Sequence, residues 1–538
     1  MTQAAATAAP VRARGPGRGL GLLHILALLA ALVTLAPLAA VVVTALGPGA
    51  DSLTAETFAR YAWTSLALAG LVAIGAGVLG TLAAWIVVMH RFPGRDLFAW
   101  ALVLPLAAPA FTVAYGYADL FDVAGPVRTA LRGLVGADVP LEMRSLWGAA
   151  FVLSLAFYPY VYLTLRAALV NQSVAALEAA RSLGRTANQA FWAVTLPMAR
   201  PAIAAGMALA VMETLADYGA VSFLGVQTLT TGVVRAWSVF GSTAEAARLA
   251  LPLLAAAAAL LLIERMSRRN RAADVGPARW RPLPTTEFRG VGRWLAPLFC
   301  LTLIAFGLLL PAGWLLYRGL GVEAETARLV QGGLNALALA AAAAVITTAL
   351  AAILALGARR NRLLARLTSL GYATPGAVMA IGLLAPAGFL WRGVAGAATG
   401  FGVAIALLLL AYAARLMAAA LEPVDAGLER VTPSMHNAAR SLGQTEAGAA
   451  MKVELPMASG ALLTAALLVF IDVLKELPAT VILRPFGFDT LAVIADYYAK
   501  DERLADASWP SLLIVLVSIP AVVWLTRRVG ASRPGAPL

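Results

Sequence analysis

Residues 178–200 read EAARSLGRTANQAFWAVTLPMAR, and residues 437–459 read NAARSLGQTEAGAAMKVELPMAS. At a constant offset of 259 and without a gap, 13 of these 23 positions are identical, far more than a shared richness in alanine would produce. A second pairing lies upstream at an offset of 266, where Pro109, Ala114 and Gly116 match Pro375, Ala380 and Gly382. Self-similarity at a fixed distance indicates a duplication, so the sequence predicts two tandem copies of one unit.

The composition is typical of an integral membrane protein. The 538 residues are 61% hydrophobic and 13% charged, with a mean hydropathy of +0.82. Soluble domains are less apolar and carry about a quarter charged residues. The net charge of +13 does not indicate nucleic-acid binding, because the arginines cluster between long apolar runs rather than along one basic face. The single Cys300 and three scattered histidines offer no metal-ligand spacing, so no metal site is expected.

Twelve segments approach the length of about 20 residues that a helix needs to cross a membrane. We therefore expect an all-α membrane protein in which each half contributes six spans. Segments 97–121 and 367–391 are interrupted by prolines at 105, 109 and 375, which kinked spans tolerate. The twelve segments are 20–46, 62–89, 97–121, 146–170, 201–224, 247–264, 294–317, 333–357, 367–391, 400–420, 458–482 and 509–526.

The distribution of arginine and lysine orients these spans. Short loops on the cytoplasmic side retain positive charge, which predicts that both termini are cytoplasmic. The apolar run 20–46 is too long for the core of a signal peptide and is interpreted as a retained first span, with cleavage as the alternative. The predicted organisation is a cytoplasmic tail (1–19), a first unit of six spans (20–264, loop 171–200), a basic linker (265–293), a second unit of six spans (294–527, loop 421–457) and a second tail (528–538).

The repeated loop is more elaborate than a simple connection between spans. Small residues favour a short helix, and Gly184 or Gly443 then allows a sharp turn that a side chain with a Cβ resists. Pro197 and Pro456 suit the first turn of the following helix. Such an exposed helix, with a leucine beside the turn, can dock into a groove of another protein. The alternative is a loop that packs only against its own bundle.

The spacing from Glu178 to Pro197 resembles the signature loop of binding-protein-dependent ABC importer permeases. The second copy departs from the family pattern at its first position, where it has Asn437. The resemblance covers nearly the whole chain and implies that the loop carries a helix that couples the permease to an ATPase. The residues implied in this contact are Glu178, Ala179, Ala180, Arg181, Leu183, Gly184 and Pro197, and in the second copy Asn437, Ala438, Ala439, Arg440, Leu442, Gly443 and Pro456.

This family resemblance also implies the partners. They are two copies of a cytoplasmic ABC ATPase, a periplasmic or lipid-anchored substrate-binding protein and the lipid of a bacterial inner membrane. The only lysines, Lys452, Lys475 and Lys500, belong to no phosphate-binding loop, so ATP and Mg²⁺ are expected on the partner and no cofactor on this chain. No catalytic cluster is present in the sequence either, and the chain is not expected to be an enzyme.

The substrate is inferred from resemblance alone. The stretches 213–221 and 472–504 look most like those of iron(III) permeases, with thiamine and polyamine permeases as related alternatives. A secondary transporter of 12 spans would also explain the duplication, but it would not explain why both halves keep the same cytoplasmic loop.

Four acidic residues, Glu213, Asp217, Asp472 and Glu476, are predicted within or beside the fifth span of each half. A charge at the membrane centre costs about 2.5–3.5 kcal/mol, so these side chains should face the bundle interior or water. One hypothesis places them along the translocation path, where carboxylates attract a hard cation. The other pairs Lys475 with a neighbouring acid and assigns the remaining acids to bracing the coupling loop. The sequence favours the second slightly.

The predicted outer segment 484–508 mixes aromatic and charged residues. Such a composition suits an aromatic belt at the membrane interface or a docking surface for a soluble binding protein, and both interpretations remain open. The residues concerned are Phe486, Phe488, Tyr497, Tyr498, Lys500, Asp501 and Glu502.

Overall fold

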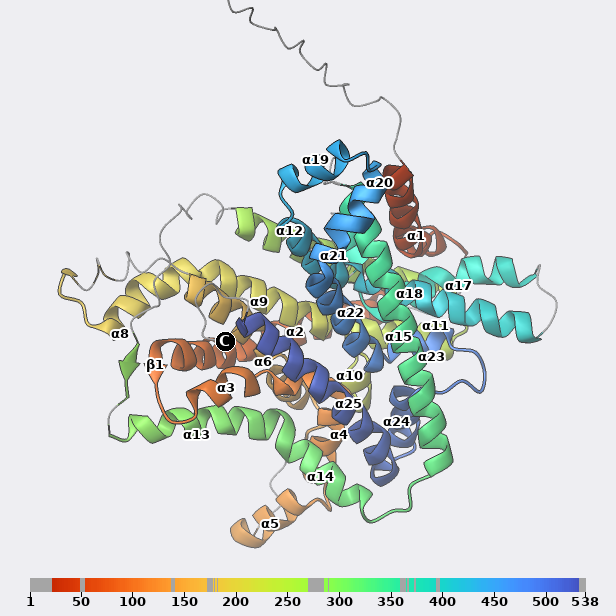
Figure 1. Ribbon diagram of the computed structural model, residues 1–538. Coiled ribbons are helices and arrows are strands. Elements are labelled where there is room, and N and C mark those ends of the chain that lie inside the picture. The colour runs from red at the N-terminus through yellow and green to blue at the C-terminus, as the bar shows by residue number, and fades with distance from the viewer. Residues whose placement is uncertain are drawn as a thin grey trace, which may run out of the picture.

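The computed structural model describes residues 22–48, 54–136, 141–171, 178, 180, 182–269, 285–288, 290–358, 364, 367–371, 374–392 and 397–531 (Figure 1). The predicted tail 1–19, most of the predicted linker and the last residues of the predicted second tail lie outside this part of the chain. So do residues 172–177, 179 and 181 of the first predicted loop, and these include two of the predicted contact residues, Ala179 and Arg181.

The described part of the first half is mostly helical and contains one two-residue strand. Its elements are α1 (Leu22–Ala45), α2 (Ala55–Met89), β1 (His90–Arg91), α3 (Arg95–Ala101), the 3-10 turn η1 (Leu104–Ala107), α4 (Ala110–Leu120), α5 (Pro126–Val135), α6 (Leu146–Asn171), α8 (Ala187–Ala190), the π-helical turn η2 (Phe191–Thr195), α9 (Leu196–Ala216), α10 (Gly219–Phe223), α11 (Leu229–Ser238) and α12 (Thr243–Arg269).

The second half begins after β2 (Thr286–Glu287), which pairs with β1 in parallel. Its elements are α13 (Gly292–Ile304), the π-helical turn η3 (Ala305–Leu309), α14 (Leu310–Gly319), α15 (Thr326–Gly357), the 3-10 turn η4 (Ser369–Gly371), α17 (Gly376–Arg392), α18 (Ala397–Leu428), α19 (Pro433–Ser441), α20 (Glu446–Ala449), the π-helical turn η5 (Ala450–Glu454), α21 (Leu455–Met457), α22 (Ser459–Leu474), α23 (Pro478–Leu483), α24 (Leu491–Lys500) and α25 (Leu504–Ala531).

Within the described residues, nine helices are long and apolar enough to cross a membrane, or up to 11 when two bent pairs each count as one span. The predicted span 97–121 is one of these pairs, bent by 86° between η1 and α4. Its break falls at Pro109, which precedes the first residue of α4 and has no N–H to continue the helix. The predicted span 367–391 corresponds to α17, whose 17 residues fall short of the length of about 20 that a span needs, and α17 is not among these helices.

The first helix of each half packs against the other half. The helix α14 of the second half packs against α4 of the first half, where a Cβ on Gly116 would lie 2.7 Å from the ring of Pro311. The helix α1 of the first half packs against α17 of the second half, where a Cβ on Gly382 would lie 2.1 Å from the carbonyl oxygen of Pro37. Gly116 and Gly382 are the glycines that the offset of 266 matches, so the sequence pairing reflects two equivalent close contacts.

Hydrogen bonds reinforce this exchange of helices between the halves. The Tyr117 hydroxyl donates to the carbonyl oxygen of Phe306 at 2.6 Å. A ring nitrogen of His24 lies 3.0 Å from the carbonyl oxygen of Gly357. The apolar cores that result contain side chains from both halves, so the two copies form one packed body rather than two independent bundles.

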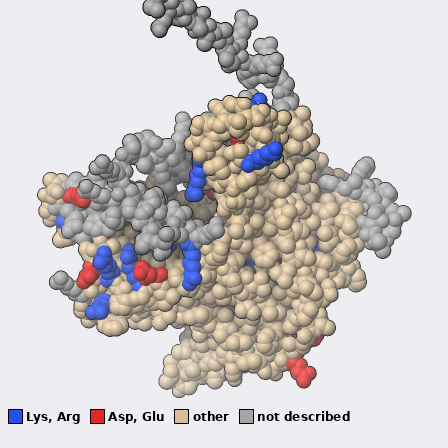
Figure 2. Space-filling view, viewed as in Figure 1, with Lys and Arg blue, Asp and Glu red and all other residues tan. Residues whose placement is uncertain are grey.

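The basic side chains are concentrated in two regions of the face shown in Figure 2, near β1 and α3 and near α19 and α20. Much of the remaining described surface in this view carries few charged side chains, as expected where lipid contacts the protein. The repeated loop of the second half therefore lies in a basic region, and its cytoplasmic position stays a prediction.

Candidate functional site

The two repeated loops have the same backbone turn. Gly184 and Gly443 both adopt a φ of 83°, in the left-handed region where a side chain is strained. The short helix before each glycine is ended by a hydrogen bond across the turn, of a kind common at helix C-termini. Arg185 N–H donates to Ala180 O, and Gln444 N–H donates to Ala439 O, each at 3.2 Å.

The exposure of the side chains also repeats. Leu183 and Leu442 are 85% and 82% exposed, whereas Ala180 and Ala439 are both 6% exposed. Each alanine thus holds the short helix against its own bundle while the leucine projects outward. Most other predicted contact residues within the described residues are exposed too, including Glu178, Asn437, Ala438 and Arg440. Pro197 and Pro456 both lie in the first turn of the next helix, as expected.

One contact distinguishes the second loop. The His436 ring nitrogen Nδ1 lies 2.6 Å from Oε1 of Glu454, a carboxylate that is almost fully buried. The pair ties α19 to the π-helical turn η5. At the offset of 259, the first half has Thr195 in place of Glu454. The second coupling helix is therefore anchored by a pair of ionisable groups that the first half cannot form.

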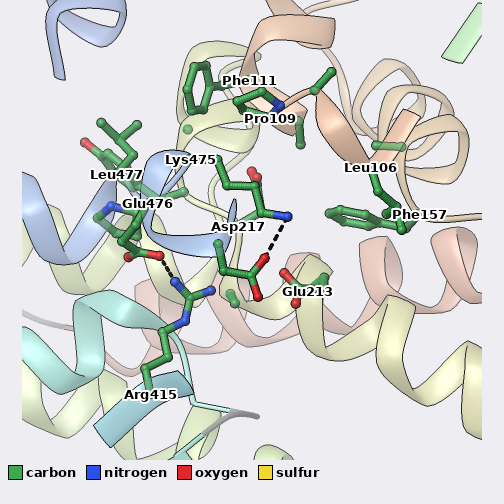
Figure 3. A pocket seen from close by; sticks show the side chains of 18 of the residues that line it. Leu106, Pro109, Phe111, Phe157, Glu213, Asp217, Arg415, Lys475, Glu476 and Leu477 are labelled. Carbon is green, nitrogen blue, oxygen red and sulfur yellow. Dashed lines mark ion pairs between the residues drawn. The ribbon is translucent and has the colours of Figure 1, made fainter. Parts of the chain in front are cut away.

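The acidic residues of both halves meet around one pocket of about 80 Å³ (Figure 3). Glu213 and Asp217 come from the end of α9, while Asp472, Lys475 and Glu476 come from the end of α22 and the turn after it. Apolar and aromatic side chains of the first half complete the lining, among them Pro109, Phe111 and Phe157. The structure thus brings together all four acids that the sequence singled out.

Charge compensation differs between the halves. Lys475 Nζ lies 2.9 Å from Oδ1 of Asp472, which is the pair that one sequence hypothesis expected. Glu476, whose side chain is 4% exposed, forms an ion pair with Arg415 of α18. Glu213 and Asp217 also face the pocket, and neither forms an ion pair within the described residues. The second half therefore neutralises its own acids, and the first half does not.

The hypothesis that the remaining acids brace the coupling loop does not describe their contacts. The Asp217 carboxylate accepts a hydrogen bond from the N–H of Val221 at 3.0 Å. At the equivalent position, Glu476 accepts one from the N–H of Ala479 at 3.2 Å. Both acids thus hold the first turn of a short helix, α10 or α23, at the pocket.

Arg415 was not singled out in the sequence. Its signal was present, because it is an arginine within the predicted span 400–420, and ionisable residues inside spans are usually functional and paired. Its counterpart at the offset of 259 is Ala156, which also lines the pocket.

Comparison with known proteins identifies the family. Residues 76–268 and 344–531 match the binding-protein-dependent transport system inner membrane component. The chain belongs to this family. The two matched stretches correspond to the two halves, so the protein is a multi-pass inner-membrane permease built as two tandem units.

Three relatives show the range of substrates among such permeases. The chain is 26% identical over 462 residues to the Fe(3+)-transport system permease protein FbpB 2 of Haemophilus influenzae, covering 83% of this chain and 85% of that protein. It is 35% identical to the sulfate transport system permease protein CysT of Salmonella typhimurium over 31% of this chain and 59% of that protein. The molybdenum transport system permease protein ModB of Escherichia coli is 29% identical over 38% of this chain and 92% of its own length.

Proposed function

We propose that this ABC importer permease translocates ferric iron, delivered by a soluble or lipid-anchored binding protein and driven by two copies of a separate ATPase. The iron(III) relative supports this substrate because its similarity extends over both halves, whereas the sulfate and molybdenum relatives match less than two fifths of the chain.

The observation that carries the proposal is the charge of the pocket. Its four carboxylates face two cationic side chains, which leaves a net charge of −2 when all are ionised (2 − 4). Such a surplus repels sulfate and molybdate and attracts cations. Carboxylate oxygen is a hard ligand that suits a hard ion. Within the described residues, no group of three or more histidine, cysteine or acidic side chains is arranged to hold a metal ion. This arrangement agrees with transient passage rather than storage.

The proposal assigns the two coupling loops to the two ATPase copies. Each loop presents one projecting leucine and one glycine turn of the same geometry, so each half offers one docking point. ATP and Mg²⁺ would then bind only the partner, and this chain would contribute no catalytic group.

The test combines Glu213→Gln with Asp217→Asn in the complex with its ATPase. We expect iron uptake into vesicles to fall at least about tenfold, because removal of interactions with a charged group costs more than about 1.4 kcal/mol. The matched control is Glu56→Gln, which removes an exposed carboxylate outside the pocket.

The ATPase must co-purify equally with both variants for this comparison to hold. Unchanged iron uptake in the double variant would contradict the role of the pocket. Uptake of sulfate, molybdate, thiamine or a polyamine in preference to iron would contradict the substrate assignment.

A further inference from the structure

A second polar cluster lies beside the pocket and joins the two halves. Lys500, the last residue of α24, donates from Nζ to Oδ2 of Asp496 at 2.6 Å and to the hydroxyl oxygen of Tyr218 at 3.1 Å. The same ammonium lies 5.1 Å from the centre of the Tyr218 ring. Tyr218 belongs to the first half, follows Asp217 directly and also lines the pocket. The cluster is therefore adjacent to the carboxylates of the proposed path.

The two charged side chains of the cluster are buried to different extents. The side chain of Asp496 is 3% exposed, whereas that of Lys500 is 41% exposed. A buried carboxylate must be compensated, since an unpaired charge in a protein interior is strongly destabilising. Lys500 supplies this compensation from the solvent side. The lysine thus stands between the predicted outer solution and an anionic group beneath it.

A third oxygen in this region lacks a partner. The Tyr115 hydroxyl of α4 is fully buried and forms no hydrogen bond within the described residues. The Tyr115 ring packs edge-on against Phe223, with ring centres 4.6 Å apart, at the end of the short helix α10 that follows Tyr218. A buried polar atom without a partner is destabilising, so such an atom in a folded protein requires an explanation. A ligand that enters the cluster would provide one.

We infer that Asp496, Tyr218 and Tyr115 form a site for a trivalent hard cation at the outer side of the pocket, and that the ammonium of Lys500 occupies it in this structure. The inference rests on the proposed function, and it names residues at which iron would first enter the protein. One carboxylate and two phenols are hard oxygen donors. The ammonium already marks a position where two of these oxygens converge on a positive charge.

Iron and Lys500 then compete for the same oxygens. A trivalent ion interacts with Asp496 more strongly than a single ammonium does at the same distance, because the Coulomb energy scales with charge. On displacement, Lys500 stays protonated and turns toward solvent, and each phenol that binds iron as phenolate releases its proton to water. Lys500 would thereby keep the path closed until iron arrives.

The experiment uses the intact permease–ATPase complex in lipid nanodiscs, with iron supplied as ferric citrate. Coordination of Fe³⁺ by a phenolate gives visible charge-transfer absorption, which a purely structural role of these residues would not produce. We expect Lys500→Met to bind iron at least about tenfold more tightly than wild type, since it removes the competing charge from a buried pair. Adding Tyr218→Phe and Tyr115→Phe should abolish the absorption band.

The matched control is Arg503→Met, which removes a nearby cation that pairs with Asp506 at 3.1 Å. It should bind iron as wild type does. If Lys500→Met does not assemble, Lys500→Gln removes the same charge while keeping hydrogen-bond donors.

Two outcomes would overturn the inference: wild-type iron affinity in the Lys500 variants, or a band that persists without both phenols. Measuring iron uptake into vesicles by the wild-type complex distinguishes a failure of this site from a failure of the proposed function. Absence of iron uptake would refute the function itself, whereas uptake without the tyrosine-dependent band would refute only this site.

Discussion

In the coupling loops the two halves share one geometry. Gly184 and Gly443 have the same φ of 83°, and the leucines beside them are exposed to nearly the same extent. Around the pocket, positions at the same offset have different partners. Glu213 forms no ion pair within the described residues, whereas its equivalent Asp472 is paired with Lys475.

This difference follows from what each region contacts in the proposed transporter. The two loops would meet two identical ATPase copies, so a change in the shared turn of one loop weakens a contact that the other retains. The pocket lies between the halves, and both contribute to a single space for one substrate. Equivalent positions of the two halves can therefore carry different residues at the pocket. The second half has Arg415 where the first half has Ala156.

The largest effect is expected at the pocket, where the two halves differ. Arg415→Met would leave the buried Glu476 carboxylate without its counter-charge, which we expect to destabilise the protein by about 3–5 kcal/mol. The measurement is thermal unfolding of the purified protein in detergent. Adding Glu476→Gln should restore most of the lost stability, because no buried charge then remains unpaired.

The matched comparison is Lys475→Met. Its partner Asp472 has a side chain that is 25% exposed, so water can compensate part of the loss. Equal destabilisation by Lys475→Met and Arg415→Met would show that burial does not distinguish the two ion pairs.

The next largest effect is expected in the coupling loops, where the two halves have the same geometry. Valine at Gly184 or Gly443 must adopt a left-handed backbone conformation, at a cost of about 1–2 kcal/mol. Because φ is the same at both positions, we expect both variants to reduce co-purification of the ATPase by similar factors while the spans still insert. Asparagine tolerates this conformation and should retain the ATPase at either position. A loss restricted to one loop would mean that the two docking points are not equivalent.

The repeat and the composition were sufficient to predict the two-unit membrane fold, because duplication and hydropathy are properties of the sequence alone. They were less informative about individual spans. Apolar length cannot distinguish a straight helix from one that bends by 86° at Pro109, since the bend depends on neighbouring helices that satisfy the freed backbone groups.

The candidate site was predictable only in part. Glu213 and Asp472 are recognisable as charges within apolar runs, but their separation in sequence says nothing about their meeting at one pocket. That meeting requires the two halves to pack as one body, with close contacts such as those at Gly116 and Gly382 that a single sequence does not reveal. The role of Lys500 likewise required the position of Tyr218, which lies 282 residues away.

A smaller effect is expected where the linker joins the first half. Phe288 stacks on the His90 ring, with ring centres 3.9 Å apart, and burial lowers the pKa of His90 from its usual value of 6.5. The neutral ring is thus favoured when the linker strand is packed. Below pH 6.5 a released His90 gains a proton that the packed one does not, so packing should weaken as the pH falls and remain at full strength above this value.

Hydrogen exchange at residues 285–288, corrected for its intrinsic pH dependence, measures this packing. We expect protection to decrease between pH 7.5 and pH 5.5 by a factor corresponding to about 1 kcal/mol or less. In His90→Gln the protection should not depend on pH. A pH-dependent loss that persists in this variant would assign the effect to another group.

The smallest effect is expected where exposed charges join the halves. Arg144 donates two hydrogen bonds to Glu502, at 2.8 and 2.7 Å, and these hold the pKa of Glu502 below its usual value of 4.5. The pair stabilises the protein above that pH and loses its contribution as the pH falls through the lowered pKa. Both side chains are about half exposed, so a double-mutant cycle with Arg144→Met and Glu502→Gln should give only about 0.2–1 kcal/mol, decreasing with added salt. A coupling as large as that of Arg415 and Glu476 would mean that exposure to solvent does not weaken this contact between the halves.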